Sequence, residues 1–249
     1  MRLDIYLAEK GYCKSRSLAQ ELIKNGSVTV NGKTVNKPSF LVDEDSNIIC
    51  GPSELCRYVS RGGLKLEAAL EEFNIDPFGK ICADIGASTG GFTDCLLKKG
   101  ALKVYAVDSG TAQLDIELKK NNKVISLENL NARYLSEHDI PEKCDIVVMD
   151  VSFISQTKLY NGVSSIISDN GIFISLIKPQ FEVGPSGIGK GGIVTDEKTR
   201  IRAVNSVCDA ALAYNFICHG TMISPIKGGD GNTEYLGYFT YRKRGDDIR

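Results

Sequence analysis

The apolar positions of the first 50 residues change their period along the chain. Leu3, Tyr6 and Leu7 are spaced as on one face of a helix, so they predict a short helix near the amino end. Ser17, with Gln20 three residues later, fits a capping box and predicts the start of a second helix there. After this second helix the pattern changes to alternation.

The alternating stretch predicts a β-hairpin. Residues 28–30 and 33–35 alternate valine with polar residues, and Asn31-Gly32 between them favours a two-residue turn. Residues 1–52 are too few to bury much core, so we expect this small α+β domain to serve in docking rather than in catalysis. Gly51-Pro52-Ser53 predicts a linker, assigned to residues 53–59, ahead of a domain over residues 60–249.

The pattern from about residue 57 onward differs, because strand-like apolar runs alternate with helical stretches. The seven predicted strands are 80–86, 103–108, 124–127, 144–151, 171–178, 216–223 and 234–241. This alternation is typical of a Rossmann-like α/β fold, an open and mostly parallel sheet with helices on both faces. The short gap between the last two strands predicts that they pair antiparallel. Ligands in such folds bind at the carboxyl ends of the strands.

Composition is that of an ordinary soluble protein. Of the 249 residues, 42% are hydrophobic and 24% charged, which excludes a mainly disordered chain. No apolar run approaches the roughly 18 residues of a membrane span, and the start lacks the apolar stretch of a signal peptide. The eight cysteines form no C-x-x-C pair and there are two histidines, so we expect no metal and reduced thiols. These features predict a cytoplasmic protein.

Charge is unevenly distributed, although the formal net charge is only −1. Between residues 10 and 37 there are six basic residues and one acid, a local excess of +5. Such a region can hold phosphate while the whole chain avoids indiscriminate nucleic-acid binding. The candidate RNA contacts in this region are Lys14, Arg16, Lys24 and Lys33. A helix face that is merely solvated remains the alternative.

A glycine-rich turn follows the first strand of the predicted sheet. It contains Asp84, Gly86, Ser88, Thr89, Gly90, Gly91 and Phe92. Asp108 closes the next strand, where a carboxylate can bind both hydroxyls of a ribose. The dinucleotide fingerprint G-x-G-x-x-G is absent, which disfavours NAD, so S-adenosylmethionine suits the spacing better. A glycine turn that binds no ligand is the alternative.

A second glycine-rich stretch imitates a phosphate-binding loop. Residues 184–190 fit that motif, but Gly191 replaces the Ser or Thr that would hold magnesium, so we expect no ATP hydrolysis. We interpret residues 179–195 as a long loop that covers or binds a ligand.

Four charged residues lie where the active edge of the sheet is expected. Asp150 and Lys178 each end a predicted strand. Lys65 precedes the first strand of the sheet, and Glu234 starts the last one. Each alone has an ordinary explanation, such as a solvated lysine, but their combination at one edge favours a catalytic site.

Taken together, these segments resemble the TlyA-type (hemolysin A) ribosomal RNA 2′-O-methyltransferases, whose catalytic domain is similar to that of the FtsJ/RrmJ ribose methyltransferases. The matching segments are 15–20, 30–32, 60–66, 84–93, 150–154, 178–182, 190–192 and 231–234. The first 50 residues resemble the alpha-L RNA-binding motif of a small-subunit ribosomal protein and of pseudouridine synthases. The resemblance therefore covers nearly the whole chain.

The resemblance implies methyl transfer from S-adenosylmethionine to a ribose 2′-hydroxyl of ribosomal RNA in ribosomal subunits, with cytidine as the nucleoside. The catalytic tetrad of the family falls on Lys65, Asp150, Lys178 and Glu234. Asp150 is also a candidate cofactor contact, and Arg61 and Lys190 are candidate RNA contacts near the active site.

The chemistry of a ribose hydroxyl agrees with these residue types. Free lysine has a pKa of about 10.4, so it is a poor base at neutral pH until desolvation or a neighbouring cation lowers that pKa. We expect Lys178 to be the base or the group that orients the hydroxyl, and Lys65 to be its cationic partner. Asp150 would organise the cofactor side and Glu234 would position the ribose.

Two other functions remain open at this point. One is an RNA-binding or ribosome-associated factor that transfers nothing. The other is a membrane-active hemolysin, as the older family name suggests, although the sequence offers neither a spanning segment nor a basic amphipathic helix. The sequence does not identify the target nucleotide, the ribosomal subunit or the oligomeric state.

Overall fold

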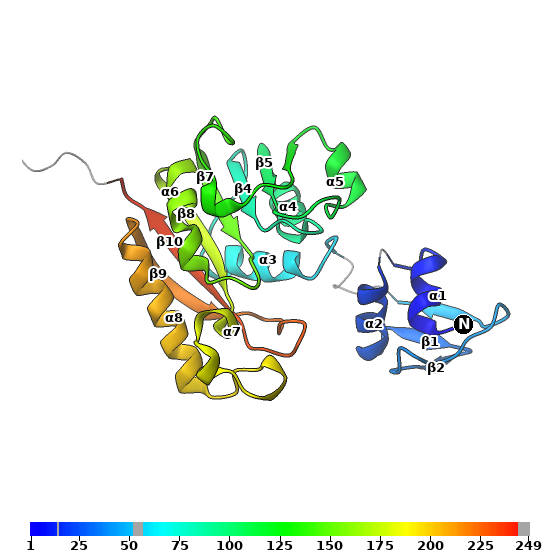
Figure 1. The fold of residues 1–249 in the computed structure, drawn as a ribbon. Helices are drawn as coiled ribbons and strands as arrows, with labels where there is room; N and C mark the ends of the chain where they lie inside the picture. Colours follow the sequence, from blue (N-terminus) through cyan, green and yellow to red (C-terminus); the bar gives the residue numbers. More distant parts are fainter. Residues whose placement is uncertain (14, 52–56, 244–249) are drawn as a thin grey trace, which may run out of the picture. The chain divides into compact units, whose positions relative to one another are not determined.

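The computed structural model describes residues 1–13, 15–51 and 57–243, drawn as a ribbon in Figure 1. The chain divides into two compact units, Met1–Arg61 and Gly62–Arg249. Lys14 and residues 53–56 of the predicted linker lie outside the described residues.

The first unit packs two helices against a small antiparallel sheet. Its elements are α1 (Leu3–Glu9), α2 (Arg16–Lys24), β1 (Val28–Val30), β2 (Lys33–Thr34) and β3 (Ile48–Cys50). The predicted hairpin is present as β1 and β2, but the sheet has the order β2-β1-β3, and the third strand was not predicted. Apolar side chains of both helices and of β1 form its core, among them Leu7, Leu22 and Val28.

The start of α2 differs from the predicted capping box at Ser17. The N-cap is Ser15, whose extended backbone lets its hydroxyl oxygen accept the N–H of Leu18 at 3.2 Å. Gln20 does not close a box with the helix end, because its amide donates instead to the buried carboxylate of Asp4 at 2.8 Å. A long-range polar contact has therefore displaced a local one.

The second unit contains the predicted seven-stranded sheet. Its strands are β4 (Ile81–Ile85), β5 (Lys103–Val107), β6 (Val124–Leu127), β7 (Cys144–Met149), β8 (Ile167–Ile177), β9 (Phe216–Ile223) and β10 (Tyr235–Tyr241). Their order is β6-β5-β4-β7-β8-β10-β9. The first five in chain order are parallel, whereas β10 runs antiparallel to both β8 and β9. The α/β class and the antiparallel final pair are confirmed, and β8 begins four residues earlier than predicted.

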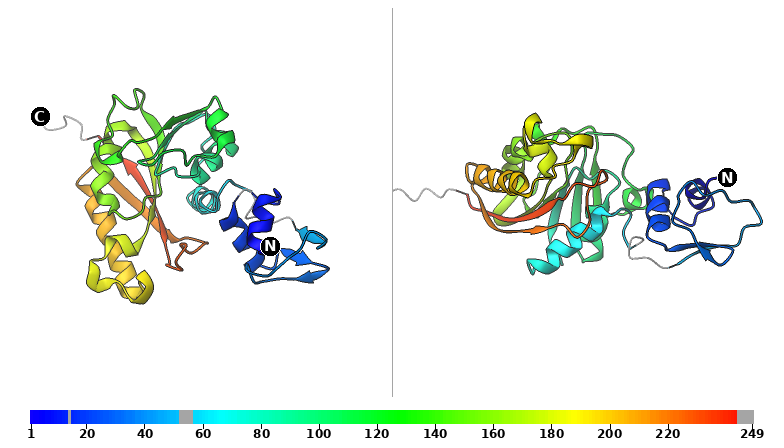
Figure 2. Two further views of the ribbon diagram at one scale, coloured as in Figure 1. Left: turned by 45° about the vertical axis from the view of Figure 1, so that its right-hand side comes forward. Right: turned by 90° about the horizontal axis from the view of Figure 1, so that it is seen from below.

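Helices cover both faces of this sheet. They are α3 (Gly62–Glu72), α4 (Gly91–Lys98), α5 (Ile116–Lys120), α6 (Tyr160–Ile166), α7 (Pro179–Glu182) and α8 (Glu197–Leu212), with short 3-10 turns η2 (Ala132–Tyr134), η3 (Gln156–Leu159), η4 (Pro185–Gly187) and η5 (Lys190–Gly192). In the right-hand view of Figure 2, α3 and α8 lie on opposite sides of β10 and β9.

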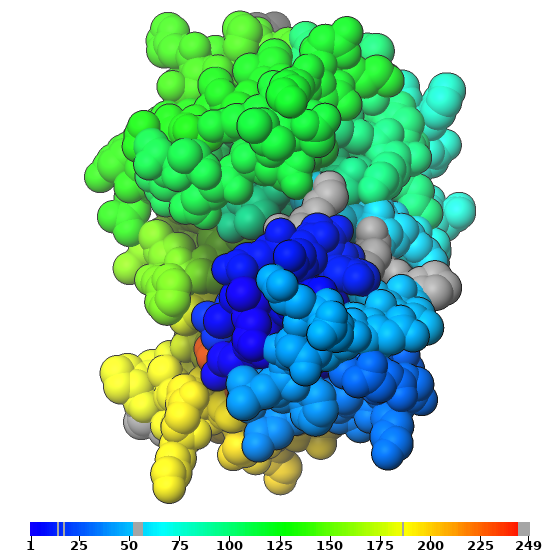
Figure 3. All heavy atoms as spheres, turned by 90° about the vertical axis from the view of Figure 1, so that its right-hand side faces the viewer, coloured from blue at the N-terminus to red at the C-terminus, as the bar shows by residue number. Residues whose placement is uncertain are grey.

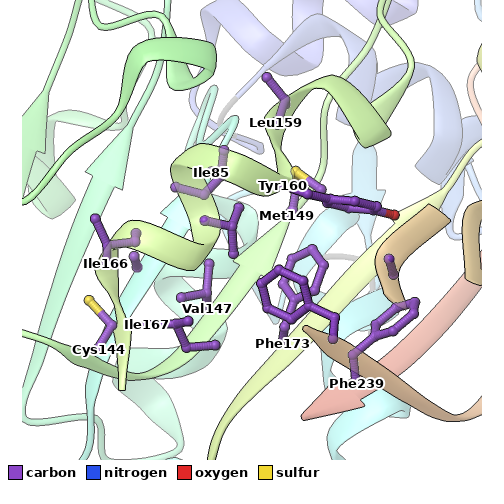
Figure 4. Packing of buried hydrophobic residues seen from close by; sticks show 14 of the residues in the cluster. Ile85, Cys144, Val147, Met149, Leu159, Tyr160, Ile166, Ile167, Phe173 and Phe239 are labelled. Atoms are coloured by element: carbon purple, nitrogen blue, oxygen red, sulfur yellow. The ribbon is translucent and has the colours of Figure 1, made fainter. Parts of the chain in front are cut away.

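An aromatic cluster fills the core beneath α6 and α8. Figure 4 shows Tyr160, Phe173 and Phe239 close together, and the ring of Tyr160 meets that of Phe173 edge-on at 5.9 Å between centroids. These side chains are almost fully buried, and aromatic packing of this kind adds to the free energy gained by burial alone. The cluster makes the central strands a rigid platform for the loops at their carboxyl ends.

Strand register determines which residues meet at that edge. Tyr235 pairs with Ile177 across the β8–β10 ladder, so Glu234 and Lys178 are neighbours just beyond it. On the other side of β8, the parallel strand β7 ends at Met149, and Asp150 follows with its N–H donating to Ile85 of β4 at 3.0 Å. The loops after β4, β7 and β8 therefore adjoin one another.

Gly86 is required where the turn after β4 passes Asp150. Its φ is +83°, and a Cβ atom there would lie 2.3 Å from the backbone oxygen of Asp150. Gly79 has a similar φ of +69°, but a Cβ on it would meet nothing within 4 Å. Alanine at position 79 would therefore cost backbone strain alone, whereas alanine at position 86 would cost both strain and a steric clash.

We expect Gly79→Ala to lower the free energy of unfolding by about 1 kcal/mol, the strain of a left-handed alanine. Gly86→Ala should lower it by clearly more, because the turn and Asp150 must also move apart. Urea unfolding of both variants measures the difference. Equal losses would contradict the close approach at Gly86.

Candidate active site

Four charged side chains form two ion pairs at the carboxyl edge of the sheet. The ammonium of Lys65, on α3, donates to a carboxylate oxygen of Glu234 at 2.6 Å. The ammonium of Lys178 lies 2.5 Å from a carboxylate oxygen of Asp150 and donates to the hydroxyl of Ser152 at 2.8 Å. The sequence predicted all four residues at this edge, but it did not predict which lysine pairs with which acid.

Burial makes the first of these pairs unusual. Lys65 is 7% exposed and Glu234 is 3% exposed. An ion pair taken out of water repays its desolvation cost poorly, so stability alone does not account for it. Gly228 packs directly on this carboxylate, since a Cβ there would lie 2.5 Å from Glu234.

A hollow of about 310 Å³ opens beside the two pairs. Lys178 and Glu234 both line it, so the hollow reaches one member of each pair. Its other lining residues are Ser152, Phe153, Gln180, Phe181, Ile188, Gly192, Gly229 and Asp230. Its volume is in the range of small-ligand sites, and its wall combines charged and apolar side chains.

An aromatic pair at this hollow was not predicted as part of the site. Phe153 is 92% exposed, and its ring lies 5.3 Å from that of Phe181 between centroids. Phe153 also has a φ of +63°, a left-handed conformation that is disfavoured for a residue with a bulky side chain. The sequence could not predict the exposure of Phe153, because exposure of an apolar side chain depends on tertiary packing. The only sequence signal for a role in the site was its position three residues after Asp150.

Asp84 is the buried acid of the glycine-rich turn. One of its carboxylate oxygens accepts the N–H and the hydroxyl of Thr93, at 2.9 and 2.7 Å. The other oxygen is buried and has no hydrogen-bond partner among the described residues. Burial raises the pKa of this carboxyl to about 7, although the hydrogen bonds from Thr93 act in the opposite direction. A buried acceptor of this kind fits a cationic ligand.

The rest of the turn consists of glycines with unusual backbone angles and of small exposed residues. Gly86 and Gly90 both have positive φ, Gly90 is the N-cap of α4, and Gly91 begins that helix. Ser88 and Thr89 are exposed on the turn. Phe92 is 3% exposed and belongs to the core.

Asp108 directly follows β5 beside this turn, whereas the predicted strand included it. Its carboxylate accepts the N–H of Ser88 and the N–H of Gly110, each at 2.7 Å. The hollow lined by Asp108, Ser88 and Gln113 measures only about 10 Å³. The turn and the acid fit an adenosyl cofactor, whereas this hollow would have to widen around exposed Gln113 to accept one.

The predicted RNA contacts have different surroundings. Lys24 and Lys33 are exposed in the first unit and form no ion pair with a described residue; Figure 3 shows the surface of that unit in blue. Arg16 is half exposed, and its guanidinium donates to Asp4 at 2.9 Å. Arg61 pairs with Glu21 at 2.7 Å. Lys190 is exposed in the glycine-rich loop.

The described residues show neither a metal-binding cluster nor a membrane-spanning helix. Within residues 1–13, 15–51 and 57–243, no three His, Cys, Asp or Glu side chains gather as a metal site would require. No helix in these ranges combines the length and the apolar character needed to cross a bilayer.

Comparison with known proteins gives two domain matches. Residues 58–241 match the FtsJ-like methyltransferase family, and residues 1–48 match the S4 domain. The first match spans the whole seven-stranded sheet. The second spans α1, α2, β1 and β2 and ends at the first residue of β3.

Individual relatives match over nearly the full chain. Hemolysin A of Brachyspira hyodysenteriae is 43% identical over 240 residues, which are 96% of this chain and 99% of that protein. The 16S/23S rRNA (cytidine-2'-O)-methyltransferase TlyA of Mycobacterium tuberculosis is 39% identical over 94% of this chain and 88% of its own. A solved structure from Streptococcus thermophilus that bears the hemolysin name has a TM-score of 0.79 at 39% identity and covers 98% of this chain and 89% of its own. The chain therefore belongs to the FtsJ-like methyltransferase family, and these matches place it among the TlyA-type proteins.

Proposed function

We propose that this protein transfers the methyl group of S-adenosylmethionine to a ribose 2′-hydroxyl of ribosomal RNA, with cytidine as the nucleoside. The main support is one observation: two ion pairs from α3, β7, β8 and β10 meet at a single hollow of ligand size. The activity named for the Mycobacterium tuberculosis relative supports the substrate. A protein acting on ribosomal subunits would work in the cytoplasm.

The cofactor would be held by the loops after β4 and β5. Asp84, Gly86 and the exposed turn at Ser88 and Thr89 would receive its amino-acid part, and Asp108 would bind its ribose hydroxyls. The group supplies an electrophilic methyl on a positively charged sulfur. Asp150 supports this arrangement, because its backbone touches Gly86 while its side chain pairs with Lys178.

Lys178 would act on the attacking hydroxyl. It lines the hollow, where it would orient the 2′-hydroxyl or take up the proton that this hydroxyl loses on methylation. Asp150 and Ser152 orient the amine of Lys178. Holding the two reactants in line would supply much of the rate.

Glu234 would position the ribose, and Lys65 would hold Glu234. We expected Lys65 to act as a cation beside Lys178; its pairing with Glu234 supports a role through that carboxylate instead. The Glu234 carboxylate faces the hollow and can accept a hydrogen bond from a ribose hydroxyl.

RNA would be bound by both units. Exposed Lys24 and Lys33 would contact phosphates from the S4 domain. Phe153, exposed at the hollow, offers a face on which an unstacked base can lie, which is how many RNA-binding proteins hold single nucleotides.

Lys178→Ala should lower the rate of methyl transfer by about 10²-fold or more, the usual loss when an acid–base group is removed. Lys178→Arg should lose a similar factor, because arginine keeps the positive charge beside Asp150 but does not deprotonate. Both variants should bind S-adenosylmethionine as the wild type does. Incorporation of labelled methyl into ribosomal subunits measures the rate. Near-normal transfer by either variant would rule out Lys178 as the base, and no transfer by the wild type would favour a non-transferring RNA-binding factor.

The double change Lys24→Ala and Lys33→Ala should weaken RNA binding and reduce the slope of log K against log salt by about two, since each phosphate contact contributes about one. Filter binding at several salt concentrations measures this slope. The matched control is Lys98→Ala with Lys120→Ala, lysines of the second unit that already pair with Asp94 and Glu117. An unchanged slope in the first double variant would count against these contacts.

Cofactor affinity should depend on pH through Asp84, whose pKa is raised to about 7 by burial. A raised pKa means that Asp84 is protonated below pH 7 and ionised above it, and only the ionised form attracts a cationic ligand strongly. Affinity for S-adenosylmethionine should therefore rise roughly tenfold from pH 6 to pH 8, then level off. Asp84→Asn should remove this rise. Calorimetric titration with S-adenosylmethionine at several pH values measures this affinity. If the wild type and Asp84→Asn show the same dependence of affinity on pH, Asp84 is not the titrating group.

A further inference from the structure

Glu182 is a largely buried carboxylate that the proposed reaction does not use. It ends α7, four residues after Lys178. One of its oxygens accepts the backbone N–H of Gln156 at 3.0 Å, and the other accepts the hydroxyl of Ser155 at 2.7 Å. Burial raises the pKa of this carboxyl, so keeping its charge in place has an energetic cost. Since α7 does not require a buried charge at this position, the role of these two hydrogen bonds is to be found in the segment that they hold.

The two residues that Glu182 holds lie at the end of the loop of the active site, Ser155 as its last residue and Gln156 directly after it. We call residues 150–155, between β7 and η3, the β7 loop. This loop supplies Asp150 and Ser152 to Lys178 and supplies exposed Phe153 to the hollow. Glu182 accepts hydrogen bonds from the carboxyl end of this loop, where η3 begins.

The β7 loop and α7 are joined at three successive places. Lys178, at the start of α7, contacts Asp150 and Ser152. In the middle, Phe181 packs against Phe153. At the end of α7, Glu182 makes its two hydrogen bonds to the far end of the loop.

Backbone strain shows that this loop needs such support. Phe153 has a φ of +63°, which a residue with a bulky side chain adopts only where its surroundings enforce it. Ser155 is further fixed by Thr157, with 2.8 Å between their hydroxyl oxygens. The contacts at the ends of the loop therefore determine where Ser152 and Phe153 lie.

We propose that Glu182 is a positioning residue, which clamps the β7 loop to α7 so that Ser152 and Phe153 keep their places beside Lys178. It touches none of the reacting groups and acts through the loop. The inference rests on the proposed function only where it concerns the rate of methyl transfer, because the order of the loop can be measured without any reaction.

Two substitutions separate geometry from charge. In Glu182→Gln the amide oxygen can still accept the N–H of Gln156, and its NH₂ can donate to Ser155, whose own proton can turn to Thr157. In Glu182→Leu both hydrogen bonds are lost at similar volume. A positioning role predicts that Gln restores function, whereas Leu does not.

Asp139 provides a matched control. Its carboxylate also accepts a backbone N–H and a hydroxyl, both from Ser136, at 3.0 and 2.8 Å. It lies ahead of β7 and does not line the hollow. Asp139→Leu therefore removes the same type of contact away from the site, and Asp139→Asn can keep it, as Glu182→Gln does.

The experiment measures methyl transfer to ribosomal subunits and amide hydrogen exchange over residues 150–157 in all four variants of the full chain. Glu182→Leu should lower kcat/KM for the RNA by about 10²-fold, the usual effect of misplacing a reacting group by about 1 Å, while KM for S-adenosylmethionine stays within about twofold. Exchange in the β7 loop should accelerate in this variant. Glu182→Gln and both Asp139 variants should resemble the wild type in both measurements.

Three results would overturn the proposal. These are an unchanged loop exchange in Glu182→Leu, a loss in Glu182→Gln equal to that in Glu182→Leu, and an equal loss in Asp139→Leu. If the wild type transfers no methyl, the proposed function fails while the exchange data still decide whether Glu182 holds the loop.

Discussion

Charge pairing at one edge of the sheet is the constraint on which the site depends. Lys65 and Glu234 are both buried, so neither can be neutralised without leaving an ion that has lost its partner away from water. Lys178 and Asp150, which follow the neighbouring strands β8 and β7, form the second pair. Antiparallel pairing of β10 with β8 brings these pairs together, because it places Glu234 next to Lys178 across the ladder. The unusual direction of one strand is thus directly tied to the chemistry.

Asp150 links this charged edge to the glycine-rich turn. Its backbone oxygen leaves room only for glycine at position 86, and its side chain is paired with Lys178. A movement of the turn at Gly86 would therefore displace Lys178, and a movement of Lys178 would displace the turn. In the proposed reaction, this connection would let a small number of residues hold the methyl donor and the hydroxyl in line.

Local sequence patterns predicted the elements well, because apolar period and turn residues act over a few positions. All seven strands of the large sheet, the turn at Asp84 and the four charged residues were predicted in this way. Features that depend on distant contacts were not. Ser15 rather than Ser17 caps α2, and Gln20 bonds to the distant Asp4. Strand β3 pairs from some 20 residues away, and the exposure of Phe153 depends on tertiary packing. The pairing of each lysine with its acid likewise follows from strand register, which a single sequence does not specify.

Analysis of the nucleosides made by the wild-type protein tests the central claim most directly. Ribosomal subunits from cells that lack this protein would be incubated with it and S-adenosylmethionine, then digested and examined by mass spectrometry. We predict that a 2′-O-methylated cytidine appears, with the added mass on the ribose. A methyl group on a base, or no new methyl group at all, would contradict the account.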